Sequence, residues 1–346
     1  MKRQMTKKGR RDSLKKVAFI GAGSFGTSLA VLIANKGYEC SIWCHSESSV
    51  DEINLQRKNS RYLKGISIPK EVTAYSDMKE AIHGAHVIVL AVPSKAIREV
   101  SRKLSPLLKG DEIIVSVAKG IEKHSLKRLS QVIKEEVNNH SVVVLSGPSH
   151  AEEVAKNIPT TVTVASEDIE AAKYIQQLFS CSTFRVYTND DLIGVEIGGA
   201  FKNIIALAAG ISDGIGYGDN TKAALMTRGM SEIIRVGTKL EGKAETFYGL
   251  TGMGDLIVTC TSMHSRNRRA GILIGEGKTC DEAVKEVGMV VEGIEAVKAF
   301  YELKCNANVE MPITTALYEV LFEGKKPEDA VMELMVRSYK EENNNI

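Results

Sequence analysis

A lysine beside an amide, in a glycine-rich and otherwise apolar stretch, is the first candidate for acid–base chemistry. Gly198 and Gly199 precede Lys202 and Asn203, and apolar residues recur around them at helical spacing. A glycine costs a helix about 0.5–1 kcal/mol relative to alanine, so the cluster indicates close approach by a ligand or another helix. Burial lowers the pKa of a lysine toward neutrality, where the amine can donate and accept a proton. The same spacing suits a lysine that extends to solvent, and spacing alone leaves both readings open.

Two downstream motifs carry groups that could assist this lysine. Asp255 lies in a glycine-bracketed turn, residues 249–256, and its carboxylate could orient the lysine or a substrate hydroxyl. Asp is also a common helix cap. The run Ser-Arg-Asn-Arg-Arg over residues 265–269 offers planar, bidentate donors that suit a phosphate or a carboxylate. Its alternative reading is a solvated helix start.

A glycine motif near the start of the chain predicts a dinucleotide site. Residues 21–26 read Gly-Ala-Gly-Ser-Phe-Gly, directly after an apolar strand and at the start of a helix. Gly21 permits the tight turn, Gly23 lets the backbone approach a pyrophosphate, and Gly26 allows the helix to pack closely on the strand. The helix N-terminus then presents free N–H groups to the phosphates.

The residues after the second strand bear on which dinucleotide binds. An acid that would bind the ribose 2′-hydroxyl of NAD is missing where the strand ends, at Trp-Cys-His-Ser of residues 43–46. Glu47 comes late and is also typical of a first helical turn. NADP is therefore admissible, with His45 and Ser46 as possible contacts of the 2′-phosphate, and the preference between NAD and NADP stays open.

Two further strand ends are expected at the ligand-binding edge of the sheet. Residues 89–94 form an apolar strand that runs into Pro93 and Ser94, and Lys119 follows a neighbouring strand that ends near Val117. Ligands of open α/β sheets bind at this carboxyl edge. Lys119 could reach a phosphate or carbonyl there, although an isolated lysine is more often a solvated surface residue.

Alternating strands and helices must position these groups. Short β-branched runs separated by helical patterns predict a doubly wound parallel sheet buried on both faces. The predicted strands are 17–20, 39–43, 87–92, 112–117 and 141–145, with helices from about Ser24 and Ser48. After about residue 194 the pattern becomes helical, at 197–211, 222–237, 281–287, 294–301, 314–322 and 330–339.

Composition narrows the class of protein. The 346 residues carry a formal charge of +2, which combines +7 in residues 1–16 with −5 in the rest, so nucleic acid is not indicated as a partner. The longest apolar runs fall well short of the roughly 18 residues that span a membrane. Six scattered cysteines without a CxxC pair indicate reduced thiols in a cytoplasmic protein, and the seven histidines show no metal-ligand spacing.

Taken together, the motifs resemble the bacterial NAD(P)-dependent sn-glycerol-3-phosphate dehydrogenase family. The matching segments occur in the family's order from about Val17 to about Tyr339 and are 21–26, 119–122, 146–153, 198–203, 220–229, 252–256, 265–269 and 290–293. The resemblance implies a Rossmann-type domain at 16–193 and an all-α substrate domain at 194–346. Residues 1–15 are expected to be a basic disordered tail. Phe201 stands where the family usually has an aliphatic residue. His150 lies at a position where the family has varied residues, and we interpret it as a packing residue.

The resemblance also implies a reaction and a set of roles. It implies reversible hydride transfer between NAD(P)H and dihydroxyacetone phosphate, giving sn-glycerol 3-phosphate for glycerophospholipid synthesis, with Lys202 as proton donor and acceptor. No metal is implied, and a homodimer is expected. Substrate contacts are implied for Lys119, Gly147, Ser149, Lys202, Asp255, Ser265, Arg266 and Asn267. Cofactor contacts are implied for Gly21, Gly23, Ser24, Phe25, Gly26, His45, Tyr62, Lys119, Ala151, Arg266, Val290 and Glu292.

Two other functions are compatible with parts of this pattern. One is a dehydrogenase of similar architecture that acts on a hydroxy acid or a sugar acid. The arginine-rich run at 265–269, which lies outside the cofactor loop, favours a phosphorylated substrate instead. The other is a non-catalytic protein that senses nicotinamide nucleotides, and the presence of both Lys202 and Asp255 argues against it.

Overall fold

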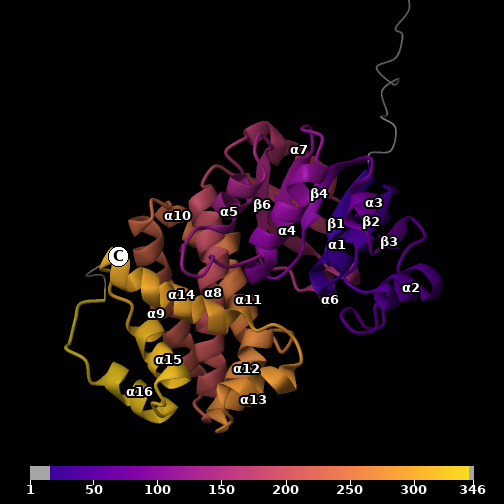
Figure 1. Ribbon diagram of the computed structural model, residues 1–346. Coiled ribbons are helices and arrows are strands. Elements are labelled where there is room, and N and C mark those ends of the chain that lie inside the picture. Colours follow the sequence, from indigo (N-terminus) through magenta and orange to yellow (C-terminus); the bar gives the residue numbers. More distant parts are fainter. Residues whose placement is uncertain (1–15, 343–346) are drawn as a thin grey trace, which may run out of the picture.

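A computed structural model describes residues 16–342 and shows a sheet half followed by a helical half (Figure 1). The sheet half, residues 16–189, has eight strands in the order β3-β2-β1-β4-β5-β6-β7-β8, all parallel to their neighbours except for the antiparallel pair β6–β7. The strands are β1 (Lys16–Ile20), β2 (Cys40–Trp43), β3 (Val72–Tyr75), β4 (Ala85–Leu90), β5 (Ile113–Ser116), β6 (Val142–Ser146), β7 (Thr160–Ala165) and β8 (Phe184–Asn189).

Helices cover both faces of the sheet, as the doubly wound prediction requires. Alternate residues of β1 divide between two cores: Phe19 packs with residues of α1 and α7, and Ile20 packs with residues of α3, α4 and α5. The α-helices of this half are α1 (Ser24–Ala34), α2 (Glu47–Gln56), α3 (Met78–Ile82), α4 (Ile97–Leu104), α5 (Leu129–Glu136), α6 (Ala151–Ala155) and α7 (Ile169–Phe179), and short 3-10 turns occupy Ser94–Ala96 and Ser105–Leu107.

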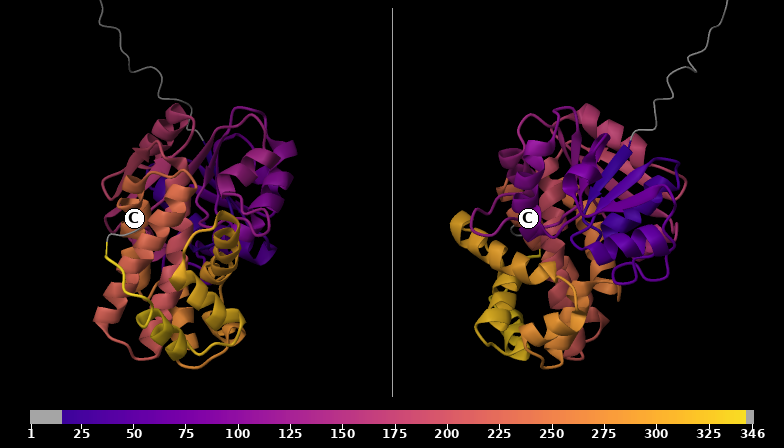
Figure 2. Two further views of the ribbon diagram at one scale, coloured as in Figure 1. Left: turned by 90° about the vertical axis from the view of Figure 1, so that its left-hand side faces the viewer. Right: turned by 45° about the vertical axis from the view of Figure 1, so that its right-hand side comes forward.

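The helical half is built around one long helix, α8 (Leu192–Gly214), which lies alongside the other helices in both views of Figure 2. The remaining helices are α9 (Asp219–Lys239), α10 (Ala244–Phe247), α11 (Asp255–Thr261), α12 (Arg266–Gly275), α13 (Cys280–Val287), α14 (Glu292–Ala307), α15 (Pro312–Phe322) and α16 (Pro327–Met335). By length and apolar composition α8 resembles a membrane span, but 89% of its most apolar window is buried inside the protein. It is the core helix of this half.

Glycines let α8 approach its neighbours at backbone distance. A Cβ on Gly210 would lie 2.9 Å from the Cα of Gly271 on α12, and a Cβ on Gly214 would lie 2.9 Å from the Cα of Gly275. A Cβ on Gly198 would lie 2.8 Å from the carbonyl oxygen of Thr251. The glycine cluster predicted to mark a close approach therefore packs helix against helix.

The predicted fold class is confirmed, with differences in detail. The strands β3, β7 and β8 were not predicted, and neither were the four helical segments between residues 244 and 275. The sheet ends at Asn189 and α8 begins at Leu192, so the expected boundary at 193/194 falls in the first turn of α8 and stays a prediction. The predicted basic tail, residues 1–15, lies outside the described residues.

Candidate active site

A buried carboxylate between two lysines lies where the two halves meet. Lys202 on α8 donates from Nζ to Oδ1 of Asp255 at 2.5 Å, and Lys119, after β5, donates to Oδ2 at 2.5 Å. Asp255 is 1% exposed and Lys202 is 7% exposed. Two cations around one carboxylate leave the cluster a net positive charge, which suits an anionic substrate or a developing alkoxide.

Local structure explains how Asp255 reaches α8. A π-helical turn, Leu250–Gly254, precedes α11 and passes against Gly198, where a Cβ would block it. Asp255 is then the first residue of α11, so the predicted turn residue is a helix-start residue. One turn later, Thr259 donates to the Asp255 carbonyl oxygen at 2.5 Å and accepts from Lys202 Nζ at 2.7 Å.

The surroundings shift the pKa values of the two central groups. Burial lowers the pKa of Lys202 to about 8, with the positive charge of Lys119 acting in the same direction and Asp255 opposing both. Burial alone would raise the pKa of Asp255, but the charges of Lys119 and Lys202 lower it overall. Lys202 can therefore exchange a proton near neutral pH while Asp255 stays ionised.

The substrate residues expected at the end of β6 adjoin this cluster. Lys119 Nζ donates to the carbonyl oxygen of Gly147 at 3.0 Å, and Ser149 Oγ donates to the same oxygen at 3.0 Å. A Cβ on Gly199 would lie 2.7 Å from Ser146 Oγ and 3.6 Å from Lys119 Cγ, so α8 lies close to this strand end. The hydroxyl of Ser146 is buried and has no hydrogen-bond partner among the described residues.

The predicted phosphate residues form the N-terminus of α12. Ser265 caps the helix by accepting from the Arg268 backbone N–H at 3.2 Å, and no acid lies in the first turn. Asn267 ties this end to the lysine helix, because its Nδ2 donates to Asn203 Oδ1 at 2.9 Å. Asn267 Oδ1 also accepts from the Gly293 N–H at 2.9 Å, which brings the 290–292 segment to the same place.

The arginines of this run differ in what they contact. Arg268 bonds Asp213 through Nε at 2.9 Å and the Thr261 carbonyl oxygen through Nη1 at 3.1 Å. It is therefore a structural residue. Arg266 is exposed, and the Nε of Arg269 is buried without a partner among the described residues. An unpartnered buried N–H beside an acid-free helix N-terminus fits a phosphate group.

The glycine motif forms the predicted turn between β1 and α1. Gly21 has φ +115°, and a Cβ there would lie 2.7 Å from the Ala91 carbonyl oxygen at the end of β4. The nearest atom to a Cβ on Gly23 would be 3.9 Å away, so the helix start is open to a ligand. α1 has neither a side-chain cap nor an acid in its first turn. These features fit the pyrophosphate of a dinucleotide.

The other predicted cofactor residues surround this turn. Ala151 and Ala155 on α6 pack with Leu63, with Phe25 at the edge of the cluster. Glu292, two positions after Val290, accepts from the backbone N–H of Ser94 at 3.1 Å and from its hydroxyl at 2.5 Å. His45 is exposed after β2, where its ring meets that of Trp43 edge-on.

Two residues with evident roles in this geometry were not predicted. Asn59 donates from Nδ2 to the Ala22 carbonyl oxygen at 2.8 Å and to Thr27 Oγ1 at 2.9 Å, and its Oδ1 accepts from the Tyr62 N–H at 3.3 Å. It thus holds the glycine turn and the Tyr62 segment together. Thr259, which contacts both Lys202 and Asp255, is the other. Short polar motifs give no periodic signal, so their partners could not be found from sequence.

His150 is another polar group at this site. Its ring lies 5.7 Å from that of His264, and burial together with the charge of Lys202 lowers its pKa. Its Nε2 has no hydrogen-bond partner among residues 16–342. Within the same range no group of three or more His, Cys, Asp or Glu side chains is placed to hold a metal ion, and all six cysteines are free.

Comparisons with known proteins agree with this geometry. The models of the NAD-dependent glycerol-3-phosphate dehydrogenase N-terminus and C-terminus match residues 16–172 and 191–332. The chain is 64% identical over 329 residues to the glycerol-3-phosphate dehydrogenase [NAD(P)+] of Clostridium perfringens SM101, covering 95% of this chain and 99% of that one. The Clostridium tetani protein of the same name is 63% identical over 330 residues, covering 95% of each.

A solved structure extends the likeness to three dimensions. The crystal structure of glycerol-3-phosphate dehydrogenase from Coxiella burnetii superposes with a TM-score of 0.91 at 40% identity, covering 94% of this chain and 100% of that one. The resemblance that the motifs carried is therefore confirmed over nearly the whole chain.

Proposed function

The chain belongs to the NAD-dependent glycerol-3-phosphate dehydrogenase family, and from that premise we propose that it interconverts dihydroxyacetone phosphate and sn-glycerol 3-phosphate with Lys202 as the proton donor and acceptor. It is an oxidoreductase that uses NAD(P)(H). The observation that carries the role of Lys202 is its position: a buried amine whose pKa is lowered to about 8 and whose Nζ is held by Asp255 and Thr259.

Ketone reduction adds a hydride to the carbonyl carbon and a proton to its oxygen. The bound nicotinamide supplies the hydride in this direction and accepts it in the other. Lys202 Nζ donates its proton to the carbonyl oxygen and becomes a neutral amine, which Asp255 and Thr259 keep oriented for reprotonation. The ammonium group of Lys119 lies beside it and would stabilise the negative charge that develops on oxygen.

The substrate phosphate is assigned to the N-terminus of α12. Arg266 and the backbone N–H groups after Ser265 would bind it, and Asn267 keeps this helix end beside Asn203 and therefore beside Lys202. Binding energy from the phosphate then orients the carbonyl toward the lysine. Gly147 and Ser149 would contact the substrate from the end of β6.

The cofactor is assigned to the turn between β1 and α1. Residues 21–26 would hold the pyrophosphate, while Phe25, Tyr62 and Ala151 would line one side of the site and Val290 and Glu292 the other. Glu292 is held by Ser94, so the cofactor would lie between residues of both halves. Because no acid ends β2, either NAD or NADP is compatible, with His45 as the candidate contact for a 2′-phosphate.

The cellular setting is proposed from the family alone. We infer a cytoplasmic homodimer that supplies sn-glycerol 3-phosphate for glycerophospholipid synthesis, without nucleic acid as a partner. Within residues 16–342, the single helix with the length and composition of a membrane span is α8, and it is buried inside the protein.

The proposed activity is tested by following NADH and NADPH absorbance in parallel with dihydroxyacetone phosphate as substrate. We expect oxidation of at least one reduced nucleotide that depends on dihydroxyacetone phosphate, and the reverse reaction with sn-glycerol 3-phosphate. The unphosphorylated ketone dihydroxyacetone is the control, and it should react at least about 100-fold less efficiently because it lacks the group that the α12 N-terminus binds. No turnover with either nucleotide would exclude the proposed function.

A further inference from the structure

The loop between β5 and α5 contacts both halves of the molecule. This connecting loop, residues 119–128, begins with Lys119 in the active site. Ile121 is buried in the hydrophobic core of the helical half, and Leu126 packs against the same core. At the far end, Arg128 forms an ion pair with the buried Glu196 of α8. The loop therefore belongs to the sheet half by sequence and to the helical half by packing.

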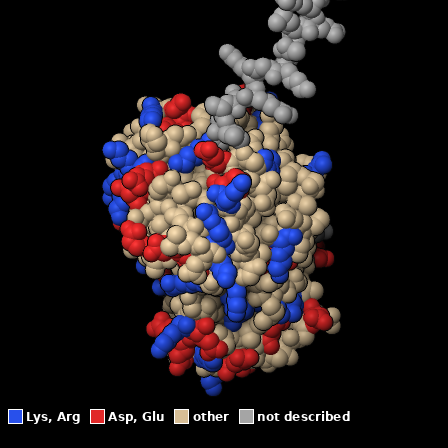
Figure 3. All heavy atoms as spheres, turned by 90° about the vertical axis from the view of Figure 1, so that its right-hand side faces the viewer, with Lys and Arg blue, Asp and Glu red and all other residues tan. Residues whose placement is uncertain are grey.

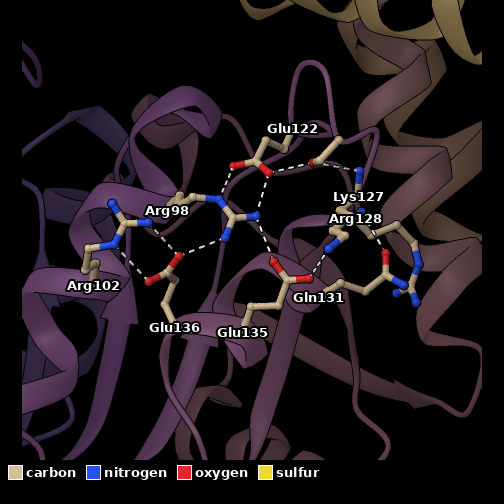
Figure 4. A network of polar contacts seen from close by, with 9 residues as sticks. Arg98, Arg102, Glu122, Lys127, Arg128, Gln131, Glu135 and Glu136 are labelled. Carbon is tan, nitrogen blue, oxygen red and sulfur yellow. Dashed lines mark hydrogen bonds and ion pairs between the residues drawn. The ribbon is translucent and has the colours of Figure 1, made fainter.

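Within the connecting loop, Glu122 is fixed to the sheet half by one arginine. Arg98 on α4 binds it through two parallel bonds, Nε to Oε1 and Nη2 to Oε2, each 2.7 Å long (Figure 4). A bidentate arginine–carboxylate pair fixes orientation as well as distance. Ser125 Oγ adds a 2.6 Å bond to Glu122 Oε2.

Arg98 is itself held in place from the other side. It donates to Glu136 at 2.8 Å and to Glu135 at 2.9 Å, both on α5 (Figure 4). Arg98 is 27% exposed at the side chain and Glu122 is 22% exposed, so the pair is partly shielded from solvent. The neighbouring Arg102 is 66% exposed and pairs with Glu136, but it forms no described hydrogen bond or ion pair with Glu122. Both arginines therefore pair with Glu136, but only Arg98 binds Glu122, the residue that belongs to the connecting loop.

The backbone of the connecting loop needs such restraint. His124 and Leu126 have φ values of +68° and +55°, a region that residues with a Cβ rarely adopt. Glu122 closes the turn with its own backbone, since its N–H donates to the Lys127 carbonyl oxygen and its carbonyl oxygen accepts from the Leu126 N–H, each at 2.9 Å. Fixing Glu122 therefore fixes the loop and the position of Lys119 three residues earlier.

We propose that Arg98 is a positioning residue that acts through Glu122 to hold Lys119 against Asp255. This proposal rests on the proposed function, because it concerns the geometry of the same reaction. Arg98 touches neither the lysines nor Asp255, so its effect must pass through the connecting loop. Losing the Arg98–Glu122 pair lets Lys119 withdraw from Asp255, and the cluster around Asp255 then has one cation fewer.

The withdrawal of Lys119 has an effect that ordinary destabilisation lacks. The positive charge of Lys119 helps to lower the pKa of Lys202. When Lys119 moves away, the pKa of Lys202 rises, so the pH above which ketone reduction declines moves upward. A variant that merely unfolds more easily loses active enzyme without moving this pH.

The test compares Arg98→Met with its matched control Arg102→Met in the full-length enzyme. For Arg98→Met we expect kcat/KM for dihydroxyacetone phosphate to fall about 10- to 100-fold. The alkaline limb of its pH profile, where ketone reduction declines, should be displaced to higher pH. For Arg102→Met we expect a change within about twofold and an unmoved limb. Glu122→Gln should have the same effect on kcat/KM and on the pH profile as Arg98→Met. The double variant should lose no more activity than either single variant, because both substitutions remove the same Arg98–Glu122 pair.

Two outcomes would overturn the positioning role. One is an Arg98→Met enzyme that behaves like Arg102→Met. The other is a loss of activity without displacement of the limb, which would make Arg98 a structural residue only. If Arg98→Met does not fold, Arg98→Lys keeps the charge without the bidentate fork and should show a smaller loss with the same displacement. A wild-type enzyme that is inactive with dihydroxyacetone phosphate would instead refute the proposed function.

Discussion

At the scale of residues, the site depends on one buried carboxylate that serves two amines. Lys202 and Asp255 are 53 positions apart in sequence, so each could be identified as a candidate from its local motif but their pairing could not. The motif around Lys202 left open whether its amine reaches solvent, and burial among the residues of α8 and α11 decides this. Thr259 carried no sequence signal, because a threonine one turn after an aspartate is unremarkable without the lysine it contacts.

The pH dependence of the reaction follows from the environment of Lys202. A proton donor must be protonated, so kcat/KM for ketone reduction should fall as pH rises through about 8. Alcohol oxidation needs the neutral amine, so its kcat/KM should rise over the same range. Profiles of both directions from about pH 6 to 10 check this. Flat profiles in both directions would contradict the assignment.

At the scale of elements, the helices with a periodic apolar pattern were predicted, and the helical segments between residues 244 and 275 were not. Helices such as α8, α9 and α14 repeat apolar residues over several turns, which makes them visible in the sequence. The segment from α10 to α12 contains a π-helical turn and helices of four to ten residues, broken by glycines. Its shape is dictated by contact with Gly198, Gly210 and Gly214 of α8, and a long-range contact of this kind has no local pattern.

A buried glutamate on α9 provides an element-scale prediction. Glu232 is 1% exposed and caps α15 by accepting from Ile313 N–H, Thr314 N–H and the Thr314 hydroxyl. Burial raises its pKa from 4.5 to about 7, against the hydrogen bonds that lower it. A raised pKa contributes stability that is present below the unfolded value and is lost as pH rises through the folded value.

Replacing Glu232 with Gln should remove this pH dependence, and it keeps one of the two oxygens that accept hydrogen bonds from α15. Wild type should lose stability as pH rises from about 4.5 to 7, whereas Glu232→Gln should not. The free energy of unfolding of the variant minus that of wild type should therefore increase over this range, by up to about 3 kcal/mol. Urea unfolding at several pH values measures it. The exposed Glu302→Gln on α14 is the control. Parallel stability curves for Glu232→Gln and wild type would refute the raised pKa.

At the scale of the whole molecule, the site exists only where both halves meet. Ser94 with Glu292 and Arg128 with Glu196 join the sheet half to the helical half. The total charge of +2 combines +7 in residues 1–16 with −5 in the rest of the chain. Positive potential for phosphorylated ligands must therefore be concentrated at the site itself. Figure 3 shows Lys and Arg side chains along one face of the molecule, including the level at which its outline narrows. Composition predicted the net charge, and folding decided its distribution.

The central claim, that Lys202 moves the proton, is tested most directly by single-turnover and steady-state kinetics of Lys202→Ala. Asp255 keeps its bond to Lys119 in this variant, so we expect a folded protein that binds NADH and dihydroxyacetone phosphate. Its kcat should fall by about 10²- to 10⁴-fold, the range of general acid catalysis, and its alkaline limb near pH 8 should disappear. Lys278→Ala, at an exposed ion pair on the surface, should retain wild-type kcat. A Lys202→Ala enzyme with near-normal kcat and an unchanged pH profile would contradict the account.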